Sequence, residues 1–152
     1  MDKRRDKQRV LDAAKRKLNE ILAEYRERID ELRAVTVEND LAETASQTEG
    51  RRDADIELMN SIGEKMEQVR RDMDTLEQVD PSIVHEQVQF GSLVKTDQRN
   101  FLIAASIEDF DADGTEYLGL SVRSPLYRTL SGHRKGDSVE LNNTIYVIET
   151  VA

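Results

Sequence analysis

The sequence predicts an α+β protein in which a long antiparallel α-helical hairpin comes before a small α+β module. Two observations predict this order. In two stretches before Pro81 the apolar residues recur every three or four positions, which is a helical spacing, and no Gly or Pro precedes Gly50. After Pro81 the apolar residues form short runs separated by turn residues, as strands do. We therefore expect a coiled-coil hairpin over residues 1–80 and a separate module over residues 81–152.

The composition is typical of a long hairpin beside a small core. Of the 152 residues, 38% are apolar and 35% are charged, which is too charged for one compact globule of this size. The absence of cysteine excludes disulfides and cysteine-based zinc sites. No apolar run approaches the roughly 20 residues of a membrane span, and the charged N-terminus does not resemble a signal peptide. We expect a soluble, cytoplasmic protein without membrane contact.

Two apolar stripes predict the helices of the hairpin. The first stripe consists of Leu11, Ala14, Leu18, Ile21, Leu22, Tyr25, Ile29 and Leu32. The second has strict heptad spacing and consists of Met59, Ile62, Met66, Val69, Met73 and Leu76. Each stripe is narrow and needs a partner, so we expect two helices of about 28 residues that pair with each other within the chain. The alternative is a pair of separate helices that dimerise between chains.

Antiparallel pairing of the stripes also predicts where the chain folds back. If Leu11 faces Leu76, then Tyr25 faces Ile62, and the fold-back point lies near residues 43–44. The surrounding segment contains four carboxylates and no Lys or Arg, which predicts an acidic tip near residues 38–49. At a rise of 1.5 Å per residue, helices of about 28 residues make a hairpin on the order of 40 Å long.

The net charge of −9 is unevenly distributed. Residues 1–35 carry an excess of Lys and Arg, whereas residues 36–55 and the C-terminal module carry an excess of Asp and Glu. Such asymmetry is typical either of oriented docking on a charged partner or of an ordinary solvated helical surface. Charge alone leaves both interpretations open.

The C-terminal half predicts four or five short strands and one short helix. Ser124 supplies a capping hydroxyl, Pro125 suits the first helical position, and Gly132 is placed to end the helix after about two turns. Asn142 and Asn143 predict a tight hairpin, because Asn tolerates positive φ. The expected strands lie at residues 88–94, 101–107, 117–122, 138–141 and 144–149.

Three sequence segments resemble a known family. Residues 121–139 read Ser-x-x-Ser-Pro-Leu-x-x-x-Leu-x-Gly-x-x-x-Gly-Asp-x-Val, which resembles the C-terminal signature of the Gre-type bacterial transcript-cleavage and elongation factors. The run Phe90-Gly91-Ser92-Leu93-Val94 is similar to the strand that opens their C-terminal module. The run Asp40-Leu41-Ala42-Glu43 resembles the Asp-Leu-x-Glu tip of the family.

This resemblance implies an FKBP-like C-terminal module and RNA polymerase as the partner. The hairpin would enter the secondary channel and meet the nascent RNA in the elongation complex. Asp40 and Glu43 match the tip carboxylates, which help to hold an Mg²⁺ shared with the polymerase active centre, and no other cofactor is implied. Ser124 and Pro125 match the loop that faces the polymerase. The protein would then not be an enzyme itself, but would stimulate cleavage of backtracked RNA by the polymerase.

The tip departs from the family pattern, which usually reads Gly-Asp-Leu-x-Glu-Asn-Ala-Glu-Tyr. Asn39 replaces the Gly, Thr44 the Asn, Ser46 the second acid and Gln47 the Tyr. Two alternatives therefore stay open. One is an inhibitor that occupies the channel without supporting cleavage, and the other is a coiled-coil interaction or chaperone-like protein that does not bind RNA polymerase.

Overall fold

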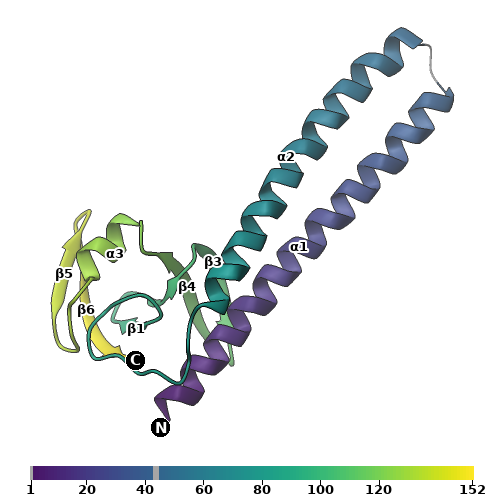
Figure 1. Ribbon diagram of the computed structural model, residues 1–152. Helices are drawn as coiled ribbons and strands as arrows, with labels where there is room; N and C mark the ends of the chain where they lie inside the picture. Colours follow the sequence, from purple (N-terminus) through teal and green to yellow (C-terminus); the bar gives the residue numbers. More distant parts are fainter. Residues whose placement is uncertain (1, 43–44) are drawn as a thin grey trace. The chain divides into compact units, whose positions relative to one another are not determined.

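The structure, a computed structural model, describes residues 2–42 and 45–152, with the side chains of residues 36–51 outside the description (Figure 1). Two long helices, α1 (Lys3–Ala42) and α2 (Ala45–Glu77), precede a mixed sheet with one short helix. The chain therefore has the α+β class that the sequence predicts. It divides into two compact units: Met1–Leu18 with Asp72–Ala152, and Asn19–Arg71. The predicted domain boundary at residues 80 and 81 stays a prediction.

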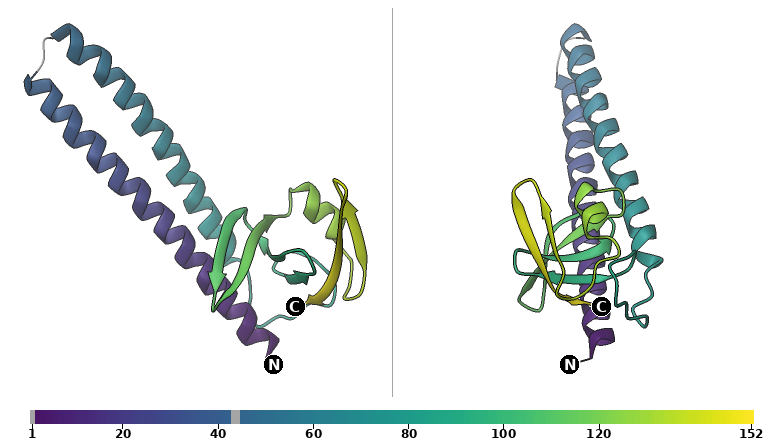
Figure 2. Two further views of the ribbon diagram at one scale, coloured as in Figure 1. Left: turned by 180° about the vertical axis from the view of Figure 1, so that it is seen from behind. Right: turned by 90° about the vertical axis from the view of Figure 1, so that its left-hand side faces the viewer.

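In the unit Asn19–Arg71, α1 and α2 lie side by side and run antiparallel (Figure 2). Their contact is a core of Leu32, Ile62 and Met66, to which Leu22, Tyr25, Ile29 and Met59 add partly buried side chains. The predicted neighbours Tyr25 and Ile62 share this core. The two stripes thus pair within the chain.

The helices are longer than the sequence analysis expects. They span 40 and 33 residues instead of about 28, and α1 ends at Ala42 while α2 begins at Ala45. These ends lie on either side of the predicted fold-back point. The segment between the apolar stripes contains no Pro and only one Gly, Gly50, so a helix can extend into it from either side although most of its side chains are polar.

Gly63 offers a simple test of the hairpin. It lies inside α2, and no heavy atom lies within 4 Å of the position that a Cβ would take. We expect Gly63→Ala to raise the free energy of unfolding by about 1 kcal/mol, because alanine loses less backbone entropy than glycine in a helix. Urea unfolding followed by far-UV circular dichroism measures this. An unchanged or lowered midpoint would contradict the packing of α2 described above.

The C-terminal module contains a six-stranded mixed sheet with the order β3-β4-β2-β1-β6-β5. Strands β2 and β4 are parallel and the other neighbours are antiparallel. The strands are β1 (Leu93–Thr96), β2 (Asn100–Ala104), β3 (Ile107–Ala112), β4 (Thr115–Ser121), β5 (Ser138–Leu141) and β6 (Thr144–Val151), and helix α3 (Pro125–Leu130) follows β4. The described part of the chain therefore has one strand more than the upper sequence estimate.

Two predicted strands are wrong in extent. Of residues 88–94, only Leu93 and Val94 belong to β1, because Gly91 adopts a φ of +85° and turns the chain before the strand begins. Residues 101–107 do not form one strand. The chain leaves β2 at Ala104 and enters β3 at Ile107, because these two strands lie on opposite sides of β4. Both flanks of the break are buried, so hydrophobicity alone does not reveal it.

Side chains are buried on both faces of the sheet. One face forms a core with Leu130 of α3 and includes Val94, Phe101, Ile103, Leu120 and Ile148. On the other face Leu102, Phe110 and Tyr117 are buried, and a small cavity there is lined by residues of both the sheet and the first turns of α1. Within the unit that contains Met1–Leu18, the start of α1 is therefore part of the module.

No helix among the described residues has the length and hydropathy that a membrane span requires.

Candidate functional site

The side chains of the two predicted magnesium ligands, Asp40 and Glu43, lie outside the residues that the structure describes. Asp40 lies in the last turn of α1, but its side chain is outside the described residues. Glu43, which follows Ala42 directly, is outside them altogether. Among the side chains that the structure does describe, no group of three or more His, Asp and Glu residues could hold a metal ion.

The predicted partner-binding residues Ser124 and Pro125 form the start of α3. Ser124 is the N-cap, and its hydroxyl oxygen accepts a hydrogen bond from the Tyr127 backbone N–H at 3.1 Å. The same hydroxyl donates to the Ser121 carbonyl at 2.8 Å, so both bonding roles of the side chain are used. Pro125 occupies the first turn, where its missing N–H costs nothing. The predicted cap is confirmed.

This loop presents a rigid and partly apolar surface. Pro125 is exposed, and the nearby Val122 is 39% exposed although it is apolar. Because the Ser124 hydroxyl both donates and accepts a hydrogen bond, it restrains the backbone at the start of α3.

The second half of the motif over residues 121–139 is a turn that connects the end of α3 by a hydrogen bond to the segment before β1. Gly132 adopts a φ of +79°, which ends the helix as predicted, and its N–H donates to the Val88 carbonyl at 2.9 Å. Gly136 has a φ of +92° and turns the chain towards β5. Both glycines thus have conformations that side chains rarely allow.

Asp137 completes this turn through its carboxylate. Its Oδ2 accepts from the Arg134 backbone N–H at 2.8 Å and lies 3.2 Å from Nδ1 of His133. The first of these bonds, with smaller contributions from His133 and the Arg134 charge, holds the pKa of Asp137 below its ordinary value. The Gly-Asp pair of the motif therefore has a clear structural role.

Sequence reasoning missed Lys7, whose side chain is fully buried at the base of α1. Its Nζ donates to the Ile83 carbonyl at 2.6 Å. Burial lowers the pKa of Lys7 from 10.5 to about 8, against the opposing effect of the Asp80 carboxylate. A signal was present in the sequence, since Lys7 precedes Leu11 by four residues and so continues the apolar stripe.

His85 and Ser92 form a second polar contact, partly buried, near Lys7. Nδ1 of His85 lies 2.9 Å from the Ser92 hydroxyl, which also accepts from the Gln89 backbone N–H at 3.0 Å. Burial, with a smaller effect of the Lys7 charge, lowers the pKa of His85. Ser92 is inaccessible, so this pair is a structural contact rather than a nucleophile and its base.

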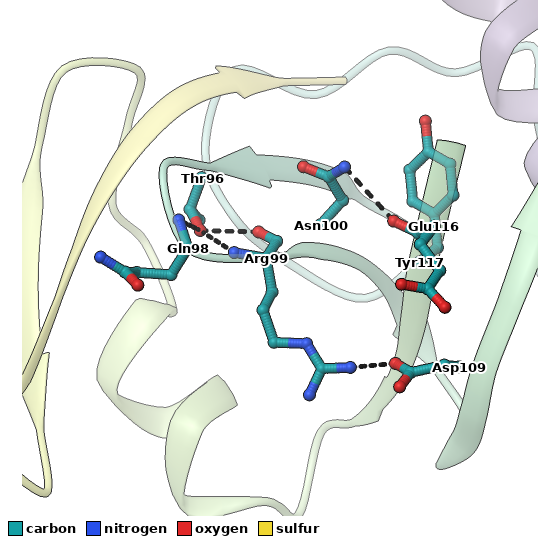
Figure 3. Close-up of a pocket in the computed structure, with 7 residues that line it drawn as sticks. All are labelled: Thr96, Gln98, Arg99, Asn100, Asp109, Glu116 and Tyr117. Carbon is teal, nitrogen blue, oxygen red and sulfur yellow. Dashed lines mark hydrogen bonds and ion pairs between the residues drawn. The ribbon is translucent and has the colours of Figure 1, made fainter. Parts of the chain in front are cut away.

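A polar cavity of about 260 Å³ lies beside the turn between β1 and β2 (Figure 3). Arg99 pairs with Asp109, Nδ2 of Asn100 donates to the Glu116 carbonyl at 3.3 Å, and the Thr96 hydroxyl donates to the Arg99 carbonyl at 2.6 Å. These polar groups satisfy one another, and the pairing of Arg99 leaves no free cation in the wall. We assign no ligand to this cavity.

Fold and site together define a class: an α+β protein with a helical hairpin ahead of a mixed-sheet module, and a capped Ser-Pro loop on that module. No protein-family model matches the chain, and no curated protein matches it. Among solved structures, the chain is similar to the transcription factor Gfh1, at 19% sequence identity and a TM-score of 0.37. The alignment covers 91% of this chain and 93% of that one.

Proposed function

We propose that this protein is an accessory transcription factor that binds RNA polymerase in the cytoplasm. The observation that carries the proposal is the motif over residues 121–139, which resembles the Gre-type signature and folds locally as the motif predicts. Ser124 caps α3, and Gly132 and Gly136 take positive φ. The exposed Pro125 and Val122 beside this cap are the surface we assign to polymerase contact.

The helical hairpin is the part that enters the secondary channel of the polymerase and approaches the nascent RNA. Two features support this role: the pairing of the stripes through Leu32, Ile62 and Met66, and the place in the sequence of Asp40, within the last turn of α1, and of Glu43, the residue after Ala42. A helical hairpin with a carboxylate pair between its two helices in the sequence could bring these groups into the channel. The hairpin would not need a catalytic site of its own.

Asp40 and Glu43 supply the chemistry that this proposal requires. Mg²⁺ prefers oxygen ligands and keeps several waters, so one or two carboxylates fit it as a partial ligand set. Such a pair binds the ion weakly by itself, and the rest of the ligands would come from the polymerase active centre. Asp40 and Glu43 would help to hold the ion there, and the ion would supply the charge stabilisation that phosphodiester hydrolysis needs.

The deciding experiment is cleavage of RNA in a stalled elongation complex, with binding to the polymerase measured separately. We expect the wild-type protein to accelerate cleavage, and Asp40→Ala with Glu43→Ala to return the rate to that of polymerase alone while binding is retained. The matched control is Glu24→Ala with Glu27→Ala, since both residues are exposed on α1 and have the same spacing. The control should cleave like wild type.

Each other outcome has a definite meaning. If the Asp40 and Glu43 double variant cleaves as fast as wild type, the metal-ligand role is wrong. Binding without cleavage, together with slower RNA synthesis, would favour the channel-blocking inhibitor. The observation that supports the inhibitor as a second candidate function is the replacement of the usual tip residues of the family by Asn39, Thr44, Ser46 and Gln47. Failure to bind polymerase would overturn the whole proposal in favour of another partner.

A further inference from the structure

A second, smaller cavity lies between the first turns of α1 and the sheet. Its volume is about 160 Å³, and all of its lining residues belong to the unit that contains Met1–Leu18 and Asp72–Ala152. The polar residues around it are Asp6, Arg9, Lys95, Asp113, Thr115 and Tyr117. It differs from the cavity beside Arg99 because its wall includes Lys95, a lysine without an ion pair among the described residues, whereas Arg99 is paired with Asp109.

Tyr117 brings a buried hydroxyl to this cavity. Only 4% of the residue is exposed, and no described residue forms a hydrogen bond with its hydroxyl. The ring is held by stacking on Phe110, with 6.1 Å between the ring centroids. The hydroxyl points away from the Arg99 and Asp109 pair (Figure 3). Buried polar groups usually have a hydrogen-bond partner, so this hydroxyl favours a polar ligand in the cavity.

Lys95 supplies a cation without a counter-ion. It is half-buried on β1, and no described carboxylate forms an ion pair with it. The sheet register places it across from Asn100 on β2, and the parallel pairing of β2 with β4 places Tyr117 one strand further on. Lys95 and Tyr117 therefore lie in one row across the sheet and line the same cavity.

The remaining charges of the wall largely neutralise one another. Arg9 pairs with Asp6, and its Nη1 also lies 3.4 Å from Oδ2 of Asp113. With Lys95 included, the wall holds two positive and two negative groups. The buried Tyr117 hydroxyl and the half-buried Lys95 ammonium have no partner among the described residues and can both donate hydrogen bonds, and the exposed Thr115 adds a further hydroxyl. Donors from several directions around a small space favour an acceptor with several oxygens.

We infer that this cavity binds a free tetrahedral oxyanion of the phosphate class, held by Lys95, Tyr117 and Thr115. A water could satisfy the Tyr117 hydroxyl but would leave the half-buried ammonium without a counter-charge, and an anion satisfies both. A volume of about 160 Å³ admits one such anion with a little water, since a water occupies about 30 Å³ in the liquid. This inference does not depend on polymerase binding.

The test is an NMR titration of the full chain with inorganic phosphate, at an ionic strength kept constant with chloride. We expect saturable shifts at the amides of Lys95, Thr115 and Tyr117. Lys95→Met should weaken binding by at least about tenfold, since a hydrogen bond to a charged group is lost. Tyr117→Phe removes one oxygen and keeps the stacked ring, and should weaken binding severalfold.

Two controls separate this site from general screening. Lys135→Met makes the same charge change at an exposed lysine outside the cavity and should bind phosphate like wild type. Acetate and adenosine monophosphate should bind more weakly, because acetate has fewer oxygens and the nucleotide is too large for the cavity. The inference is overturned by the absence of saturable shifts, by equal affinities of all variants, or by tighter binding of either alternative probe.

Discussion

Gly119→Ala is expected to lower the free energy of unfolding by about 3 kcal/mol, because the sheet has no room for a methyl group at this position. A Cβ there would lie 2.5 Å from the Ala105 carbonyl oxygen and 2.7 Å from the backbone nitrogen of Ile107. Both are backbone atoms of the crossing from β2 to β3. They cannot move aside without disturbing the pairing of Gly119 with Leu102 and Ile107.

Urea unfolding of the full chain, followed by far-UV circular dichroism, measures this loss. Gly63→Ala is the matched control, since it makes the same chemical change at a glycine with open space and should have the opposite sign. If Gly119→Ala unfolds at the same urea concentration as wild type, the crossing between β2 and β3 does not approach β4 as closely as described. Loss of stability in both variants would instead point to a general intolerance of alanine.

Lys7→Ala is the second change with a large expected effect. It removes a fully buried side chain and leaves the Ile83 carbonyl without its donor at 2.6 Å. A cavity and an unsatisfied acceptor together should cost about 3 kcal/mol. Lys65→Ala removes the same side chain from an exposed position on α2 and should change stability by no more than about 0.5 kcal/mol.

The charge of Lys7 also predicts how stability depends on pH. The pKa is about 8 in the folded protein and 10.5 in the unfolded chain, so between these values the unfolded state binds more protons. The free energy of unfolding should therefore rise as the pH increases from 8 to 10.5. The neutral amine can still donate to the Ile83 carbonyl, so deprotonation removes the burial cost of the charge while the contact remains.

Lys7→Met isolates this effect, because methionine fills similar space and does not titrate. The difference in unfolding free energy between wild type and Lys7→Met should shift in favour of wild type across the same pH range. Other titrating groups are present in both proteins and cancel in the difference. A difference that stays constant with pH would show that Lys7 keeps an ordinary pKa, and burial of its charge would then be wrong.

Features that depend on residues close together in the chain could be predicted from the sequence. The spacing of the stripes predicted the helical hairpin and the shared core of Tyr25 and Ile62. The Ser124 cap, and the Asn142-Asn143 turn with φ values of 52° and 65°, were predicted from single residues. In each case a pattern of residues close together in the chain contains the information, even where the contact that it predicts, such as that of Tyr25 with Ile62, joins two helices.

Other features were decided by contacts between distant segments. The crossing between β2 and β3 interrupts a continuous apolar run, because both strands pair with β4 from opposite sides. The same holds for Lys7, which the sequence presents as one charge in a charged N-terminus but which is buried in the folded protein and donates to the carbonyl of the distant Ile83. The unsatisfied Tyr117 hydroxyl likewise exists only once α1 covers the sheet. Hydrophobicity and charge describe a residue alone, whereas burial and satisfied hydrogen bonding depend on which distant neighbours the tertiary structure brings to it.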